Sequence, residues 1–437
     1  MLYQGSKMNS SPDKSKGITN MVEKTPPVVH EFVEREVGLH AYIVIDSLRN
    51  GQSCGGLRIS DDVTLEEIKS LASSMTRKYC FLQRTMGGAK AGIILPNSST
   101  KEHRAQVLEA FGRNAAELLK NKTYIPWTDL GSNSEDIAII MKSAGCDCHR
   151  ISDSSYFTAL TVVSAIKAAC EIRNIDLSGC SVIIEGFGNV GMHAASELTK
   201  LGASIVGIST IAGALYDTNG LDIKKLIGLQ KTFNDDIIHH YGKGVLERKE
   251  QLLELNADIL VPCARTWSIN TTNMKNIKAK IIAPGANVPM TKEAEAYLHQ
   301  HGVLCLPDFL CNLGGVFGTS LYDNRNSLPT VHRFIMNEFG AMTKEILRWS
   351  AQKNLLPSDV AEAIAEENCT RIHHQMHSWF WRKKYLLPFL SGNVVVQKFL
   401  PRFDAWVSLR AQRRIFVENM RLMQTGFLDY PSPSGRN

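Results

Sequence analysis

Residues 181–198, SVIIEGFGNVGMHAASEL, decide the fold, because an apolar β-branched run passes directly into a glycine-rich turn and then into a helical pattern. Gly186, Gly188 and Gly191 have the spacing G-x-G-x-x-G. In such a strand–turn–helix unit the first glycine permits the tight turn, the second lets a phosphate approach the backbone, and the third lets the helix pack on the strand. The amides at the start of the helix then face the pyrophosphate of a dinucleotide. The other turn residues that we assign to this site are Phe187, Asn189 and Val190.

The G-x-G-x-x-G spacing alone is a weak signal, because a glycine-rich turn can be purely structural. Residues 203–209, ASIVGIS, supply a second strand at the distance expected of a βαβ unit. This second strand favours a dinucleotide-binding unit over a structural turn.

Length and composition indicate a globular protein of two domains. The chain has 437 residues, of which 44% are hydrophobic and 21% are charged. No apolar run approaches the ~18 residues of a membrane-spanning helix, and residues 1–28 are a polar leader without the apolar core of a secretory signal. The ten cysteines do not form the pattern of a small disulfide-rich domain, which indicates a reducing, cytoplasmic location. The single C-x-C at 146–148 does not make a convincing metal site, and we expect no metal.

The C-terminal region differs in charge from the rest of the chain. Residues 371–437 carry 11 Lys and Arg against 3 Asp and Glu, interleaved with aromatic residues such as Trp379, Phe399 and Trp406. Binding of nucleic acid or an anionic surface is one interpretation. Amphipathic helices that pack on the body or on another subunit are the favoured one, so we consider nucleic acid an unlikely partner.

Strand and helix patterns alternate along the body of the chain. Strands are predicted at 39–46, 93–95, 123–127, 181–185, 203–209, 257–262, 279–283 and 302–306, and helices at 64–82, 101–120, 134–143 and 158–175. This alternation predicts an α/β protein with a doubly wound parallel sheet and ligands at the carboxyl ends of its strands. From residue 327 onward the pattern is helical.

Two lysines and an aspartate are candidate functional residues of the N-terminal part. Lys78 borders the apolar stripe of the helix at 64–82, and Lys90 lies at the centre of a predicted glycine-rich loop at 85–92. Asp129 follows the strand at 123–127, where it is either functional or only a turn residue or helix cap.

Taken together, these motifs resemble the Glu/Leu/Phe/Val amino-acid dehydrogenases from about residue 30 to residue 325. The resemblance implies a substrate domain at 29–150, a Rossmann domain at 151–325 and a cleft that closes between them, with a helical region at 326–437. It also implies NAD or NADP as cofactor and an oligomer, expected here to be a homo-oligomer. The motifs are CGGLR at 54–58, MGGAK at 86–90, Asp129, GFGNVG at 186–191, GAN at 285–287 and NLGGV at 312–316.

The resemblance also implies roles for single residues. Lys90 falls on the family's catalytic lysine, Lys78 on the lysine that binds the substrate α-carboxylate, and Asp129 on the catalytic aspartate. The implied reaction transfers hydride from an L-amino acid to the nicotinamide, after which water converts the iminium to a 2-oxo acid and ammonia. Further residues assigned to the substrate are Cys54, Gly87, Gly88, Asn312 and Thr319, and further residues assigned to the cofactor are Thr158, Thr210 and Asn287.

This chain departs from the family's glutamate-specific members at one position. Those members place a lysine 24 residues before the α-carboxylate lysine, where it pairs with the substrate's side-chain carboxylate, and this chain has Cys54 there. Thr319 stands where those members have an assisting serine. The departure predicts a substrate with a neutral or apolar side chain.

Two more departures concern the cofactor and the catalytic segment. The second Rossmann strand usually ends with an acidic residue for the ribose, and this chain has Thr210, which leaves the choice between NAD and NADP open. Ala91 replaces a family glycine after the catalytic lysine.

Two other functions remain open from the sequence. The same fold carries condensation reactions of 2-oxo acids, and a catalytically silent protein could keep the cofactor for regulation. The presence of Lys78, Lys90 and Asp129 favours a dehydrogenase over the silent protein. The resemblance fades beyond residue 370, so we expect the basic tail to be separable from the catalytic unit.

Overall fold

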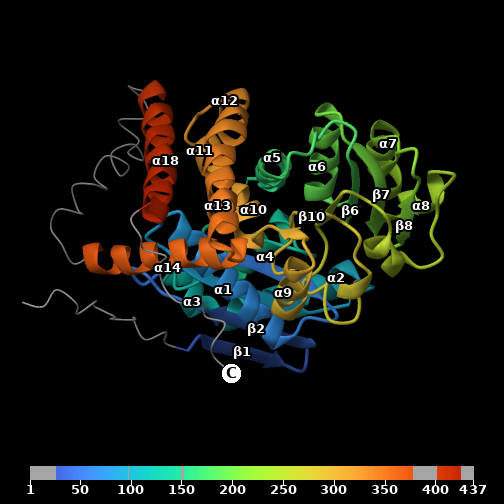
Figure 1. Ribbon diagram of the computed structural model, residues 1–437. Helices are drawn as coiled ribbons and strands as arrows, with labels where there is room; N and C mark the ends of the chain where they lie inside the picture. Colours follow the sequence, from blue (N-terminus) through green and yellow to red (C-terminus); the bar gives the residue numbers. More distant parts are fainter. Residues whose placement is uncertain (1–25, 97, 149–151, 377–400, 425–437) are drawn as a thin grey trace, which may run out of the picture.

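The computed structural model describes residues 26–96, 98–148, 152–376 and 401–424, which form two sheets flanked by helices (Figure 1). The first sheet has the order β1-β2-β4-β3-β5. Its central pairs β3–β4 and β3–β5 are parallel, whereas β1–β2 and β2–β4 are antiparallel. The strands are β1 Val28–Glu34, β2 Leu39–Ile45, β3 Ser53–Ser60, β4 Gly87–Ile94 and β5 Ile125–Thr128.

Helices cover both faces of the first sheet. Helix α1 (Leu65–Phe81) packs on one face through Ile68 and Leu71, and α2 (Lys101–Asn114) packs on the other through Phe111. The Thr64 side chain caps α1 by accepting a hydrogen bond from the Glu67 amide. The predicted helix at 101–120 is interrupted at Ala115, after which α3 (Ala116–Lys120) begins, and α4 (Ser134–Ser143) packs beside α2.

The glycine-rich segments near Cys54 and Lys90 are the strands β3 and β4, so the prediction of a loop at 85–92 was wrong from Gly87 onward. Glycine is normally unfavourable in strands, but it is required where backbones approach closely. A Cβ on Gly55 would lie 1.6 Å from the carbonyl oxygen of Ala89, and a Cβ on Gly88 would lie 2.1 Å from the amide nitrogen of Thr76 in α1. The glycines therefore allow β3, β4 and α1 to pack tightly, and they fix Lys90 on a strand.

The second sheet contains the Rossmann unit and has the order β11-β10-β9-β6-β7-β8. Its pairs are parallel except β7–β8, so a doubly wound parallel sheet ends in one antiparallel edge strand. The two-domain α/β architecture predicted from the sequence is confirmed. The strands are β6 Ser181–Glu185, β7 Ser204–Thr210, β8 Gly213–Tyr216, β9 Ile259–Pro262, β10 Ile281–Ile282 and β11 Leu304–Cys305, and the flanking helices include α6 Asn189–Lys200, α7 Ile223–Phe233, α8 Ile237–His240, α9 Lys292–Gln300 and α10 Asp308–Cys311.

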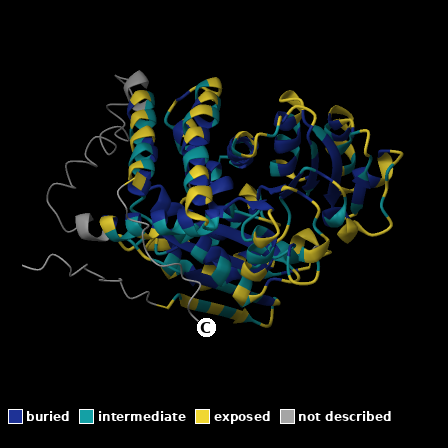
Figure 2. Ribbon diagram, in the orientation of Figure 1, coloured by how far each residue is buried: buried dark blue, intermediate teal, exposed yellow. Residues whose placement is uncertain are grey.

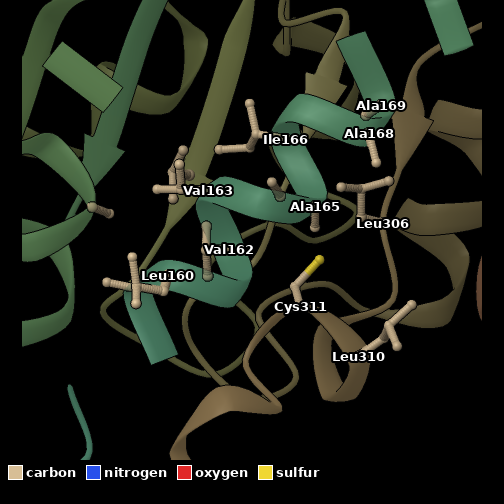
Figure 3. Packing of buried hydrophobic residues seen from close by; sticks show 14 of the residues in the cluster. Leu160, Val162, Val163, Ala165, Ile166, Ala168, Ala169, Leu306, Leu310 and Cys311 are labelled. Atoms are coloured by element: carbon tan, nitrogen blue, oxygen red, sulfur yellow. The ribbon is translucent and has the colours of Figure 1, made fainter. Parts of the chain in front are cut away.

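Helix α5 (Ser155–Arg173) is the central helix of the larger hydrophobic core. Ala165 and Ala168 face Leu306, while Leu160 and Val163 project from the opposite side (Figure 3). Among the described residues it is the one helix long and apolar enough to cross a membrane, which the sequence analysis did not identify. However, 78% of its apolar stretch is buried inside the protein. Burial on all sides explains its uniformly apolar sequence.

The described part of the basic tail packs into this core. Helix α18 (Pro401–Gln424) stands beside α13 (Gly340–Lys353) (Figure 1), with a buried inner side and an exposed outer side (Figure 2). Phe416 of α18 is buried and contacts Phe317 and Phe339. The helix–packing interpretation therefore holds for residues 401–424, and the expectation of a separable tail was wrong for them. Trp379 and Phe399 lie outside the described residues; the other C-terminal helices are α11 Gly314–Asp323, α12 Leu328–Phe334 and α14 Pro357–Met376.

We predict that Phe416→Ala lowers the free energy of unfolding by about 3–5 kcal/mol, because it leaves a cavity among packed aromatic rings. Denaturant titration of the full-length protein measures this change. The exposed Arg421, on the same helix, provides the control, since Arg421→Ala should change stability by no more than about 0.5 kcal/mol. Equal effects of the two substitutions would show that α18 does not stabilise the body.

Candidate active site

Lys90 and Asp129 form a buried ion pair at the centre of the first sheet. Cys54 and Gly56 lie on the same face of β3, and Lys90 lies on the neighbouring parallel strand β4, while Asp129 follows the last residue of β5. The Lys90 Nζ lies 2.9 Å from Asp129 Oδ2, and the Lys90 side chain is only 2% exposed. A Cβ on Gly56 would lie 2.8 Å from Asp129 Cβ, so glycine is needed there to make room for the pair.

Arg58 supports the same carboxylate from the side. Its Nε donates to Asp129 Oδ2 at 3.2 Å, and its Nη1 donates to Glu67 of α1 at 2.5 Å and to Thr266 at 3.0 Å. Burial on its own would raise the pKa of Asp129, but Lys90 and Arg58 outweigh it and hold this pKa well below the usual range. The alternative of Asp129 as a helix cap is wrong, because Asn133 caps α4.

Lys78 reaches from the last turn of α1 toward the second sheet. Its Nζ donates to Asn287 Oδ1 at 2.6 Å, and Asn312 Nδ2 donates to the same oxygen at 3.0 Å. Burial lowers the pKa of Lys78 to about 8, against a smaller opposing effect of Asp308. Three of the residues singled out in the sequence therefore meet between the two sheets.

The chemistry available to these groups is proton transfer beside a fixed positive charge. Burial lowers the pKa of Lys90, and the neighbouring Asp129 opposes that shift. A lowered pKa makes Lys90 a better proton acceptor than a lysine in water, and Asp129 Oδ2 at 2.9 Å lies within hydrogen-bond distance of its Nζ. Perturbed groups of this kind cluster at functional sites.

Two buried polar atoms of the assigned substrate residues have no hydrogen-bond partner among the described residues. They are Asn312 Oδ1 and Thr319 Oγ1, both within the segment that forms α10 and α11. Buried polar atoms are normally satisfied, so unpaired ones at a candidate site are suited to a ligand.

Cys54 lies in a neutral, aromatic environment that the sequence did not reveal. Burial raises the pKa of its thiol to about 11, and hydrogen bonds from Tyr79 and Trp127 reverse this only in part. Tyr79 occupies the position next to Lys78, and Trp127 lies on β5 beside β3. The apolar spacing that predicted α1 placed Tyr79 in a core stripe, which hid its contact with Cys54.

The glycine-rich turn has the geometry that its spacing predicted. Gly186 has φ +93°, and a Cβ on Gly191 would lie 2.0 Å from the Gly186 carbonyl oxygen. A Cβ on Gly188 would meet no described atom within 4 Å, so the backbone is open there at the N-cap of α6. Phe187 is fully buried, and its amide donates to the Ser209 carbonyl at 2.7 Å. The exposed Asn189 and the half-buried Val190 form the first turn of α6.

The remaining assigned residues are packed into the protein. The Thr210 hydroxyl donates to the Asp235 carbonyl at 2.6 Å and accepts from the Ala212 amide, so both of these hydrogen bonds are made to backbone groups of the chain itself. The Thr158 hydroxyl donates to the Ser154 carbonyl and lies 2.7 Å from the Cβ position of Gly315. Gly87 leaves no space for a side chain, since its Cβ would lie 1.9 Å from the Ser47 carbonyl oxygen.

The sequence analysis also missed Glu185, which immediately precedes Gly186. Burial raises the pKa of this carboxyl to about 7, and its Oε2 accepts a hydrogen bond from Ser268 Oγ at 2.9 Å. In the sequence, Glu185 is only the last residue of a hydrophobic strand, which does not indicate that its carboxyl group is buried. The described residues contain no group of three or more His, Cys, Asp and Glu residues suited to a metal ion.

Comparison with known proteins is consistent with this geometry. Residues 151–375 match the model of the Glutamate/Leucine/Phenylalanine/Valine dehydrogenase family, and residues 27–145 match the Glu/Leu/Phe/Val dehydrogenase dimerisation domain. The NAD-specific glutamate dehydrogenase of Staphylococcus aureus is 35% identical over 283 residues, which cover 61% of this chain and 67% of the relative. The NADP-specific glutamate dehydrogenase of Saccharolobus shibatae is 32% identical over 61% of this chain and 66% of its own.

A solved structure shares the fold. The hetero-hexameric glutamate dehydrogenase of Thermus thermophilus in its leucine-bound form aligns with a TM-score of 0.67 over 82% of this chain and 91% of its own, at 22% identity.

We predict that Lys78→Met raises the free energy of unfolding at pH 7 by about 1–3 kcal/mol, because the charged buried lysine is unfavourable there. The folded-state pKa of about 8 lies below the ordinary 10.5 of the unfolded chain, so the unfolded state binds the proton more tightly. Stability of the natural protein therefore rises with pH between these values. The advantage of Lys78→Met should shrink above pH 8 by about 1.4 kcal/mol per pH unit.

Denaturant titrations between pH 7 and pH 9.5 measure this dependence. Lys69→Met on the same helix is the control, since Lys69 forms a surface ion pair with Glu66, and its removal should change stability by less than about 1 kcal/mol. A destabilisation by Lys78→Met that is constant with pH would contradict the prediction.

Proposed function

The chain belongs to the Glu/Leu/Phe/Val dehydrogenase family and is an amino-acid dehydrogenase that uses NAD or NADP, and we propose that its substrate is an L-amino acid with a neutral side chain. The observation that carries this proposal is the environment of position 54. A buried Cys54, beside Tyr79 and Trp127, offers no positive charge to a substrate carboxylate. An unpaired carboxylate in such a pocket is strongly unfavourable.

Glutamate is the competing substrate, since relatives at 35% and 32% identity are named glutamate dehydrogenases. The buried cations beside the cluster are already engaged: Lys78 with Asn287, and Lys90 with Asp129. Thr319 offers an unpaired hydroxyl, which can hydrogen-bond a polar neutral side chain as well as a carboxylate. The choice between the two substrates therefore depends on Cys54.

In the proposed mechanism Lys78 fixes the substrate through its α-carboxylate. The Lys78 ammonium is buried and donates to the neutral amide of Asn287. When substrate binds, the ammonium gains a charged carboxylate as its hydrogen-bond partner. A charge-assisted hydrogen bond of this kind is stronger than a neutral one. Lys78 thereby orients the α-carbon, and Gly87 and Gly88 act indirectly, by letting β4 pack closely against Ser47 and against Thr76 of α1.

Lys90 and Asp129 move the protons of the reaction. Neutral Lys90 accepts a proton from the attacking water, and its ammonium then stabilises the oxygen as the carbon–nitrogen bond breaks. Asp129 exchanges protons with the amino group, which leaves as ammonia. Arg58 acts on Asp129 and is a positioning residue, because it reaches Glu67 and Thr266 as well.

The residues of the glycine-rich turn fit a dinucleotide. The open backbone at Gly188 and the N-terminus of α6 are suited to the pyrophosphate, and Asn287 and Asn312 are suited to the nicotinamide side of the site. The bound cofactor supplies the hydride acceptor of the oxidative direction. Thr210 places no carboxylate at the end of β7, so no acidic side chain there would repel the 2′-phosphate of NADP.

We further propose a cytoplasmic homo-oligomer assembled through the first sheet. The edge strand β1 exposes Val28, Val29 and Val33, the last at 57%, within the residues matched to the dimerisation domain. An apolar edge strand is a favourable site for self-association. Helix α18 packs on its own body, and the structure gives no support for a nucleic-acid partner of this helix.

We predict that Lys90→Ala lowers turnover at least ~100-fold, because a positioned acid and base is removed. Dinucleotide affinity, measured by nicotinamide fluorescence, should remain unchanged, since Lys90 lies on the first sheet. Lys101→Ala serves as the control, because Lys101 is exposed at the start of α2. Near-normal turnover in Lys90→Ala would remove this residue from the mechanism.

We predict that Cys54→Lys raises kcat/KM for glutamate relative to leucine by at least about tenfold, because the new ammonium gains a partner only with glutamate. Steady-state assays with both amino acids and both cofactors measure the ratio. Cys54→Met is the control, because it enlarges the side chain without adding charge, and it should keep the preference for neutral substrates. If the unmodified protein already prefers glutamate to every neutral amino acid, another cation lines the pocket and the proposal fails.

A further inference from the structure

Two cysteines from distant parts of the chain meet at one arginine. Cys80 lies in the last turn of α1, Cys369 lies in α14, and Arg49 follows β2. The Arg49 Nη2 contacts Cys80 Sγ at 2.9 Å and Cys369 Sγ at 2.5 Å. Arg49 Nη1 donates to the Arg84 carbonyl at 3.3 Å, which orients the guanidinium. Both sulfurs contact the same nitrogen, so they are close neighbours, and the proposed dehydrogenation uses neither.

The two thiols differ in exposure and acidity. Cys369 is half-buried, whereas Cys80 is buried. The pKa of Cys369 is lowered to about 6, first by the hydrogen bond from Cys80 and also by Arg49, while burial and Glu366 oppose the shift. The same hydrogen bond raises the pKa of Cys80 well above its usual range. Cys369 is therefore mainly a thiolate at neutral pH, and the thiolate is the reactive form.

We propose that Cys80 and Cys369 form a redox-active pair, in which Cys369 reacts with peroxides and Cys80 then closes a reversible disulfide. This modification site is independent of the proposed substrate. Arg49 is the activating residue, because it is the cation that touches both sulfurs.

The chemistry balances in two steps. The Cys369 thiolate attacks hydrogen peroxide, an S–O bond forms, the O–O bond breaks, and hydroxide leaves as water after protonation. Cys80 then loses its proton and attacks the Cys369 sulfur, so that an S–S bond forms, the S–O bond breaks, and a second water leaves. Two thiols are oxidised and one peroxide is reduced. A dithiol reductant reverses the reaction by thiol–disulfide exchange.

Arg49 explains why Cys80 becomes competent for the second step. In the reduced pair, hydrogen bonding to the Cys369 thiolate keeps the proton on Cys80. A sulfenic acid at Cys369 carries no negative charge, so the guanidinium is then free to stabilise the Cys80 thiolate.

The disulfide would fasten α14 to the helix that carries Lys78. These elements already meet next to the pair, because Asn368 of α14 and Asn419 of α18 both donate to the carbonyl oxygen of Phe81, at 3.4 and 3.1 Å. The cross-link therefore joins segments that are already in contact in the reduced protein.

Peptide mapping of the full-length protein tests the proposal. The reduced protein is treated with hydrogen peroxide at pH 7, free thiols are blocked with an alkylating agent, and peptides are analysed without reductant. We expect a Cys80–Cys369 disulfide that dithiothreitol removes. Cys148→Ser, which changes the one exposed cysteine, is the control and should form the same disulfide. No disulfide, or pairing of either cysteine elsewhere, would overturn the proposal.

Alkylation and trapping assign the roles of the two thiols. In the untreated protein, Cys369 should react with iodoacetamide at pH 7 at least about tenfold faster than Cys80, because of its larger thiolate fraction and exposure. In Cys80→Ser the sulfenic acid at Cys369 should persist and be trapped by a cyclic 1,3-diketone. Arg49→Gln should slow alkylation of Cys369. Faster reaction of Cys80, or alkylation of Cys369 that is unaffected by Arg49→Gln, would overturn the assigned roles.

Discussion

The buried ion pair between Lys90 and Asp129 is the interaction on which the rest of the site depends. Removing two charges from water is costly, so such a pair is tolerable only where the geometry is good and further hydrogen bonds support it. Gly56 makes space for both side chains, and Arg58 adds a second donor to the carboxylate. The strands β3, β4 and β5 must therefore lie in parallel at close spacing. Glycines, which are otherwise unfavourable in strands, make this close approach possible.

Polar contacts between the two sheets link this pair to the cofactor side. Lys78 donates to Asn287, Arg58 donates to Thr266, and Arg265 pairs with Asp62. Each joins a residue of the first sheet's domain to a loop of the Rossmann part. The end of α1 adds an apolar contact, because Phe81 is buried against Phe309 of α10. Because Arg58 holds both Asp129 and Thr266, opening of the interface would change the surroundings of the catalytic carboxylate.

Much of this arrangement was predictable from the sequence, and the failures have physical causes. Alternating strands and helices gave the Rossmann unit, and motif spacing selected Lys78, Lys90 and Asp129. Local propensity failed at β3 and β4, where close packing outweighs the low strand preference of glycine. Tyr79 and Trp127 were hidden because an aromatic residue in an apolar stripe does not show whether it packs in the core or lines a site. The basic composition of the tail led to the prediction that it is separable from the body, although the buried Phe416 packs α18 into the core.

Two residues with strained backbone conformations lie where the two sheets meet. Trp267 and Val288 have φ +54° and φ +50°, and the Trp267 amide donates to the Val288 carbonyl at 2.9 Å. A left-handed conformation costs roughly 1–2 kcal/mol for a residue other than glycine, and a β-branched valine is especially unfavourable there. Asp308 stabilises this conformation by accepting from the Val288 amide at 2.8 Å. Thr266 and Asn287 directly adjoin the two strained residues and contact Arg58 and Lys78, so these contacts help to hold the strained loops in place.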